Sequence, residues 1–130
     1  MNKPQILIVE DDNAVANLIS ATLETQDYAY KRAATGAGAV MEALSCKPDV
    51  VLLDIVMPKL DGLGVMDKVN KDTTLKKRPA FIMISAIGQE KITEDAFDLG
   101  ADYFIMKPFD NEMVLNRIRH IKDKNRHGTE

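Results

Sequence analysis

Short apolar runs alternate with amphipathic segments along the chain. Residues 6–9 and 50–53 are continuous apolar runs of Ile, Leu and Val, typical of parallel strands buried on both faces. Residues 80–84 and 103–106 repeat this pattern and predict two more strands. Residues 28–33 are more polar and predict a strand at the edge of the sheet.

Each predicted strand is followed by apolar residues at helical spacing. Asp12 or Asn13 is suited to cap the first helix, and Thr35 the second, which ends near Cys46. Turn residues at 57–62 precede a third helix over about 63–72, and Gly100 ends the fourth. The residues expected to face inward are Val15, Leu18, Ile19, Thr22 and Leu23, then Val40, Met41 and Leu44, then Ile92, Ala96 and Leu99, and last Val114, Ile118 and Ile121. Five strand–helix units indicate an α/β fold, a parallel sheet with helices on both faces.

Composition narrows the class of protein without indicating an activity. With 130 residues, 45% of them hydrophobic, the chain is the size of one domain with a normal core. The net charge of −3 gives no general electrostatic case for binding nucleic acid or a membrane surface. One cysteine excludes an internal disulfide or a cysteine-rich zinc site. No signal peptide or membrane span is apparent, so we expect a cytoplasmic protein.

Polar side chains follow four of the predicted strands at the point where each ends. Glu10 and Asp11 follow the first strand, Asp54 the third, Ser85 the fourth and Lys107 the fifth. Because parallel strands share one carboxyl edge, where α/β sheets bind ligands, these groups should converge on one rim. Acidic residues at strand ends also cap helices, which is the interpretation we favour for Asp12 alone.

The converging groups suit phosphoryl chemistry. Two carboxylates about 5 Å apart repel by about 3 kcal/mol at an effective dielectric constant near 20, so such a cluster favours a bound cation. Its oxygen-only character favours Mg²⁺. Lys107 and Ser85 would face the transferred oxygens, and Asp54 would be the nucleophile that attacks phosphorus.

These residues lie in motifs that resemble the receiver domains of two-component response regulators. The matching segments are ILIVEDD at 6–12, LLDIVMPKLDG at 52–62, ISA at 84–86 and LGADYFIMKPF at 99–109. The resemblance implies a flavodoxin-like receiver fold with strand order 2-1-3-4-5 and five helices. It covers residues 5 to about 122, so we expect a receiver domain at 1–122 and a tail or the start of a linker at 123–130.

The resemblance implies a role for each rim residue. Asp54 would accept a phosphoryl group from phosphohistidine, and Lys107, before a cis Pro108, would pair with it. One Mg²⁺ ion would be held by Glu10, Asp11, Asp54 and the backbone carbonyl of Val56. Such a domain is not an enzyme for external substrates, since it catalyses only its own phosphorylation and slow dephosphorylation.

A conformational switch is implied as well. Ser85 would move toward the new phosphoryl group, and Phe104, which cannot donate a hydrogen bond, would turn inward through packing alone. This movement would remodel the face built from the fourth helix, fifth strand and fifth helix. Val56 and Ile87 flank the expected approach of water, and because both are apolar we expect a long-lived acyl phosphate.

The expected partners follow from the same resemblance. A histidine kinase or histidine phosphotransferase would supply the phosphate, and phosphorylation can produce a homodimer. Segments 85–90 and 98–110 are most similar to the sporulation regulators of the family, the stage 0 sporulation protein A group. That similarity implies a transcriptional role, with DNA bound by a separate C-terminal domain. A free-standing phosphorelay intermediate is the alternative.

Three other functions fit the sequence less well. A haloacid-dehalogenase-like phosphatase needs a carboxylate two residues after its nucleophile, where this chain has Val56. The sequence Gly36-Ala37-Gly38 lacks the third glycine of a dinucleotide-binding turn and follows the second strand, not the first. The last helix is basic, but its cations also complement the helix dipole, so we interpret it as a solvated helix.

Overall fold

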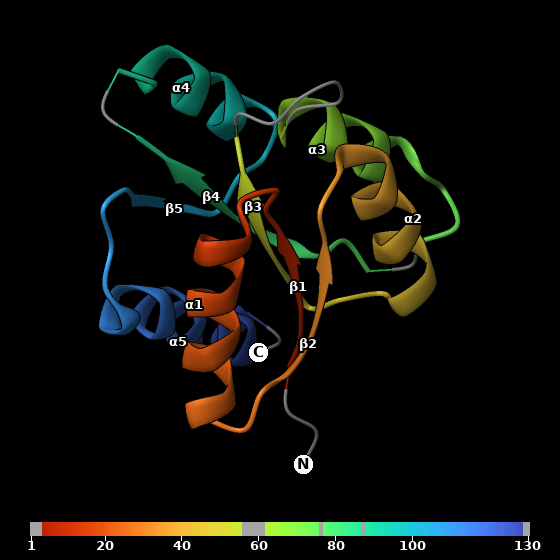
Figure 1. The fold of residues 1–130 in the computed structure, drawn as a ribbon. Helices are drawn as coiled ribbons and strands as arrows, with labels where there is room; N and C mark the ends of the chain where they lie inside the picture. Colours follow the sequence, from red (N-terminus) through yellow and green to blue (C-terminus); the bar gives the residue numbers. More distant parts are fainter. Residues whose placement is uncertain (1–3, 56–61, 76, 87, 129–130) are drawn as a thin grey trace.

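The chain folds around one parallel five-stranded sheet with strand order β2-β1-β3-β4-β5 (Figure 1). The computed structural model describes residues 4–55, 62–75, 77–86 and 88–128, with side chains as far as Ile121. The strands are β1 (Gln5–Val9), β2 (Ala29–Ala33), β3 (Val50–Asp54), β4 (Ala80–Ser85) and β5 (Tyr103–Met106). The α/β class, the strand order and the polar edge strand β2 are therefore confirmed.

Helices cover both faces of this sheet, as expected. The helices of the described ranges are α1 (Asn13–Thr25), α2 (Gly36–Cys46), α3 (Gly62–Lys71), α4 (Glu90–Asp98) and α5 (Asn111–Gly128). Figure 1 shows α1 and α5 together on one face, while α2, α3 and α4 lie on the other. Within the described ranges, no helix has the combination of length and apolar character that crossing a membrane requires.

The central strands are apolar throughout because both of their faces are buried. In β1, Leu7 and Val9 enter the core shared with α2, α3 and α4, whereas Ile6 and Ile8 enter the core shared with α1 and α5. All four side chains are fully buried. The alternation of side chains along a strand thus divides the hydrophobic residues into two separate layers.

The expected helix ends are present. The Asp12 side chain accepts hydrogen bonds from the backbone N–H groups of Ala14 and Val15, and Thr35 accepts one from Gly38. Gly100, just after α4, has a φ of +108°, and an added Cβ there would lie 2.4 Å from Arg78 Nη2. Only glycine fits this position without strain.

For two of the residues expected to face inward, the prediction is wrong. Leu18 on α1 is 44% exposed and Met41 on α2 is 72% exposed. In α2 the buried residues are Gly36, Ala39 and Ala43, whose small size lets the helix pack closely on the sheet and leaves the longer Met41 outside. In α1 the buried stripe runs through Ala16, Ile19, Thr22 and Leu23, which places Leu18 at its margin.

The last helix is longer than the apolar pattern predicts. The apolar positions end at Ile121, but α5 continues to Gly128 and so includes most of the segment expected to be a tail. Polar residues such as Lys, Arg and Asn extend a helix without needing a buried face. The role of 123–130 as the start of a linker stays a prediction.

Candidate functional site

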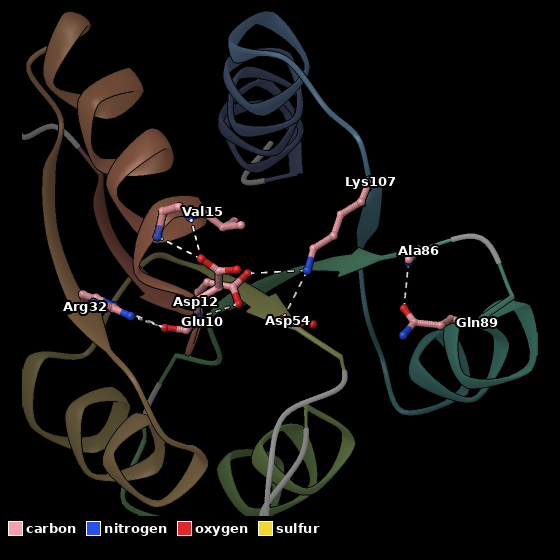
Figure 2. Close-up of polar contacts among 9 residues, drawn as sticks. Glu10, Asp12, Val15, Arg32, Asp54, Ala86, Gln89 and Lys107 are labelled. Atoms are coloured by element: carbon pink, nitrogen blue, oxygen red, sulfur yellow. Dashed lines mark hydrogen bonds and ion pairs between the residues drawn. The ribbon is translucent and has the colours of Figure 1, made fainter.

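The carboxyl edge of the sheet brings together the polar residues that the sequence placed at strand ends. Glu10 follows β1, Asp54 and Ser85 are the last residues of β3 and β4, and Lys107 follows β5. In Figure 2 the side chains of Glu10 and Asp54 lie near the ammonium group of Lys107. Lys107 Nζ is 3.4 Å from Asp54 Oδ2 and 3.8 Å from Glu10 Oε1.

Asp11 completes an acidic cluster at this rim. Glu10, Asp11 and Asp54 each place a carboxylate oxygen within 4.8 Å of the other two. Glu10 and Asp54 are buried, whereas Asp11 is exposed to solvent. The cluster therefore opens outward on the side of Asp11.

A glycine positions the end of β3 against α3. The N–H of Gly62 donates to the carbonyl of Ile55 at 2.9 Å. A Cβ added at Gly62 would lie 2.7 Å from the Asp54 carbonyl oxygen and 2.8 Å from Ile55 Cα. Only the absence of a side chain permits this approach, so Gly62 keeps the backbone under Asp54 tightly packed.

Lys107 offsets only part of the negative charge of the acidic cluster. Burial, followed by a hydrogen bond to Asp54 and the charge of Asp54, raises the pKa of Glu10 from 4.5. The backbone N–H of Asp12 and the charge of Lys107 oppose this rise in part, and the net pKa is about 8. Without a cation, Glu10 therefore holds its proton far above the pH at which a carboxyl group normally ionises.

The donor set fits a hard divalent cation. Three carboxylates supply only oxygen ligands, which is the preference of Mg²⁺. Glu10 Oε1 is buried and has no hydrogen-bond partner within the described structure. Glu10, Asp11 and Asp54 are the described residues suited to hold Mg²⁺ here, as the resemblance to receiver domains implies.

Ser85 places a second unpartnered polar atom at the rim. Its Oγ is buried without a hydrogen bond in the described structure, although its carbonyl accepts the Lys107 N–H at 2.7 Å. The Lys107–Pro108 peptide bond is cis, as the resemblance implied. Ala86, the residue after Ser85, donates its N–H to Gln89 Oε1 at 2.7 Å (Figure 2).

Phe104 on β5 is partly exposed and contacts α4. Its ring meets that of Phe97 edge to face, with centroids 5.9 Å apart and planes at 89°. Its carbonyl accepts the Nε of Arg117 at 3.3 Å. Phe104 therefore lies outward in this structure, and Phe97 covers part of it.

Sequence reasoning missed Arg32, which lies beside Glu10. Two of its nitrogens donate to the Glu10 carbonyl (Figure 2). A signal was present, because Arg32 lies near the carboxyl end of the second predicted strand, but that strand is polar and Arg32 does not follow an apolar run. Val56 and Ile87, expected to supply a metal-binding carbonyl and to exclude water, lie outside the described residues.

The basic residues of α5 that are described have partners within the chain. Arg117 donates to Phe104, and Arg119 lies 3.6 Å from the carboxylate of Glu112. These contacts accord with a helix that is charged on its solvent side.

Comparisons with known proteins agree with the fold. The family model of the response regulator receiver domain matches residues 6–119. The DNA-binding dual master transcriptional regulator RpaA of Synechocystis sp. is 37% identical over 116 residues, which cover 89% of this chain and 48% of that protein. The chain thus spans about half the length of this curated relative.

Two solved structures show the same architecture. NtrX from Brucella abortus superposes with a TM-score of 0.87 at 25% identity, covering 98% of this chain and 28% of that one. The chemotaxis protein CheY4 of Vibrio cholerae superposes with a TM-score of 0.83 at 24% identity, covering 92% and 98% of the two chains.

Proposed function

The chain belongs to the family of response regulator receiver domains, and from this premise we propose that it is a phosphorylation-activated switch whose phosphoacceptor is Asp54. Membership implies a histidine kinase or a histidine phosphotransfer protein as the phosphodonor. The observation that carries the proposal is the placement of Asp54 in the acidic cluster, with Lys107 Nζ 3.4 Å from its carboxylate.

The transfer reaction assigns a part to each side chain at the rim. A carboxylate oxygen of Asp54 forms the new P–O bond as the P–N bond of phosphohistidine breaks, and the released imidazole takes up a proton. Lys107, already at the rim, neutralises the oxygens of the transferred group. Glu10, Asp11, Asp54 and the carbonyl of Val56 would hold Mg²⁺, which when bound stabilises the charge on the transferring phosphoryl group.

The proposed switch begins at Ser85. Its buried Oγ has no partner in this structure, so a phosphoryl oxygen on Asp54 would give it its first hydrogen bond. Movement of Ser85 toward that oxygen would vacate space that Phe104 fills by turning inward. Such a change alters the surface formed by α4, β5 and α5 and needs only a few kcal/mol of difference between the two states.

Acetyl phosphate with Mg²⁺ tests the proposal directly. The wild-type chain should gain one phosphoryl group, in a bond that hydroxylamine cleaves, and Asp54→Asn should remain unlabelled. Asp67→Asn is the matched control, because Asp67 is a partly exposed aspartate on α3 that forms an ion pair with Lys71. Equal labelling of Asp54→Asn and the control would refute Asp54 as the phosphoacceptor.

We also propose that the acyl phosphate is long-lived. Val56 and Ile87, two residues after Asp54 and Ser85, carry side chains that cannot orient an attacking water molecule. Decay of the labelled protein in Mg²⁺ buffer should therefore take far longer than seconds. A half-life of seconds would contradict this part of the proposal.

For the output, we propose control of transcription through a DNA-binding domain encoded beyond this receiver or supplied by a partner. The similarity of segments 85–90 and 98–110 to sporulation regulators supports it, as does a curated relative of about twice the length that is named as a transcriptional regulator. Phosphorylation-dependent dimerisation is a further part of this proposal, and sedimentation of the phosphorylated chain distinguishes a dimer from a monomer. The alternative function is that of a free-standing phosphorelay intermediate.

A further inference from the structure

A single guanidinium joins β2 to the loop that carries the acidic pair. Arg32 lies one residue before the end of β2, which pairs with β1. Its Nη2 and Nε donate to the Glu10 carbonyl at 2.8 and 3.2 Å, and its Nη1 donates to Asn13 Oδ1 at 2.8 Å. Asn13 is the first residue of α1, so Arg32 contacts the loop at both of its ends.

Glu10 is held by further contacts around this clamp. Its N–H donates to the carbonyl of Ala33 at 3.1 Å, and its Oε2 accepts the N–H of Asp12 at 3.2 Å. Figure 2 shows the carbonyl of Glu10 turned toward Arg32 and its carboxylate toward Lys107. With its backbone and one carboxylate oxygen fixed in this way, Glu10 keeps Oε1 in the acidic cluster, where this atom has no hydrogen bond within the described structure and lies 3.8 Å from Lys107 Nζ.

Asp11 depends on the same clamp for its position. Its side chain is exposed and has no hydrogen bond or ion pair with any part of the chain that the structure describes. Its carboxylate still lies within 4.8 Å of those of Glu10 and Asp54. The backbone between Glu10 and Asn13 is therefore what places Asp11, and Arg32 contacts both of those residues.

Arg32 acts on the acidic pair through the geometry of its hydrogen bonds and not through its charge. Among the described residues, the charges that shift the pKa of Glu10 are those of Asp54 and Lys107, while Arg32 binds the opposite, backbone side of Glu10. Three nitrogens of one rigid, planar group reach two acceptors. A lysine has a single nitrogen and cannot reproduce this fork.

We propose that Arg32 is a positioning residue for the divalent-cation site, holding the loop from Glu10 to Asn13 in the arrangement that binds Mg²⁺. The inference rests on the proposed function, because it takes the acidic cluster as the Mg²⁺ site. It adds a residue from the edge strand to a site otherwise built from the ends of β1, β3, β4 and β5.

Titration of the chain with Mg²⁺ alone, followed by calorimetry, tests this inference. Arg32→Gln and Arg32→Lys should both weaken Mg²⁺ binding by about 3- to 10-fold, at or below the low end of what loss of an outer-shell partner costs. Lys31→Gln is the matched control, because Lys31 is the neighbouring cation on β2 and lies 4.0 Å from Glu42, away from the acidic pair. It should bind Mg²⁺ like the wild type.

A merely structural role would lower stability without changing metal affinity. The urea midpoint of each variant without metal is therefore measured beside its Mg²⁺ affinity. Wild-type affinity in both Arg32 variants would overturn the inference, and so would wild-type affinity in Arg32→Lys alone, since charge would then suffice. Failure of the wild type itself to bind Mg²⁺, or to be labelled at Asp54, would instead overturn the proposed function.

Discussion

Replacing Glu10 by glutamine should remove a pH dependence from the stability of the metal-free protein. The folded protein keeps the Glu10 proton up to a pKa of about 8, whereas the ordinary value, and so that of the unfolded chain, is 4.5. Between these pH values the folded state binds the extra proton, so the free energy of unfolding falls as the pH rises. The limiting slope is about 1.4 kcal/mol per pH unit.

The size of the effect can be estimated for a practical range. From pH 5 to 7.5, titration of Glu10 should lower the free energy of unfolding by up to about 3 kcal/mol. Glu10→Gln has no group to titrate at this position, so its stability should fall less or not at all. Mg²⁺ favours the ionised carboxylate, so it should stabilise the wild type most at the upper end of this range.

Urea denaturation at several pH values in a chelating buffer measures this difference. Glu42→Gln serves as control, since it makes the same chemical change in a partly exposed carboxylate 4.0 Å from Lys31. Subtracting each variant from the wild type removes the contribution of the other carboxyl groups. Parallel curves for wild type and Glu10→Gln would refute the assignment of an elevated pKa to Glu10.

Three further changes have defined outcomes. Gly62→Ala places a Cβ 2.7 Å from backbone oxygen of β3, so the free energy of unfolding, measured in urea, should fall by about 1–3 kcal/mol. Asp12→Ala removes the cap of α1 and should lower the same quantity by about 1 kcal/mol. Phe97→Ala removes an edge-to-face contact with Phe104 that is worth about 0.5–1.5 kcal/mol. The fraction of molecules in which the Phe104 ring faces inward, measured by fluorine NMR, should therefore rise by about 2- to 12-fold.

The first two of these changes have matched comparison variants, and the third has an outcome that would contradict it. Gly38→Ala meets only the Thr35 hydroxyl, at 3.0 Å, and should stay within about 1 kcal/mol of the wild type; an equal loss at both glycines would argue against the backbone clash. Asp12→Asn should retain most of the cap, so a loss as large as that of alanine would contradict it. An unchanged Phe104 signal in Phe97→Ala would show that Phe97 does not hold the ring outward.

The sequence predicted the layout of this fold well because the central strands are buried on both faces. Continuous apolar runs cannot be satisfied at a surface, so residues 6–9, 50–53 and 80–84 indicated interior strands without any knowledge of their neighbours. The order of the strands came from the family resemblance, since periodicity alone does not say which strand lies beside which.

Side-chain contacts between distant elements were much harder to predict. Arg32 contacts Glu10 only because β2 pairs with β1, and Phe97 meets Phe104 only because α4 crosses beside β5. Leu18 and Met41 were placed inward because helical spacing does not fix how far a helix is rotated about its axis. The small residues Ala39 and Ala43 decide that rotation for α2, and their effect appears only when the helix meets the sheet.

The separation of the hydrophobic core into two layers has a consequence for how such a domain can evolve. Substitutions on the α1 and α5 side have few neighbours on the α2, α3 and α4 side, because the sheet lies between them. A lineage can therefore diversify one layer while the other is kept. The strand ends lie between the two layers, so a substitution there can disturb the packing on both sides of the sheet.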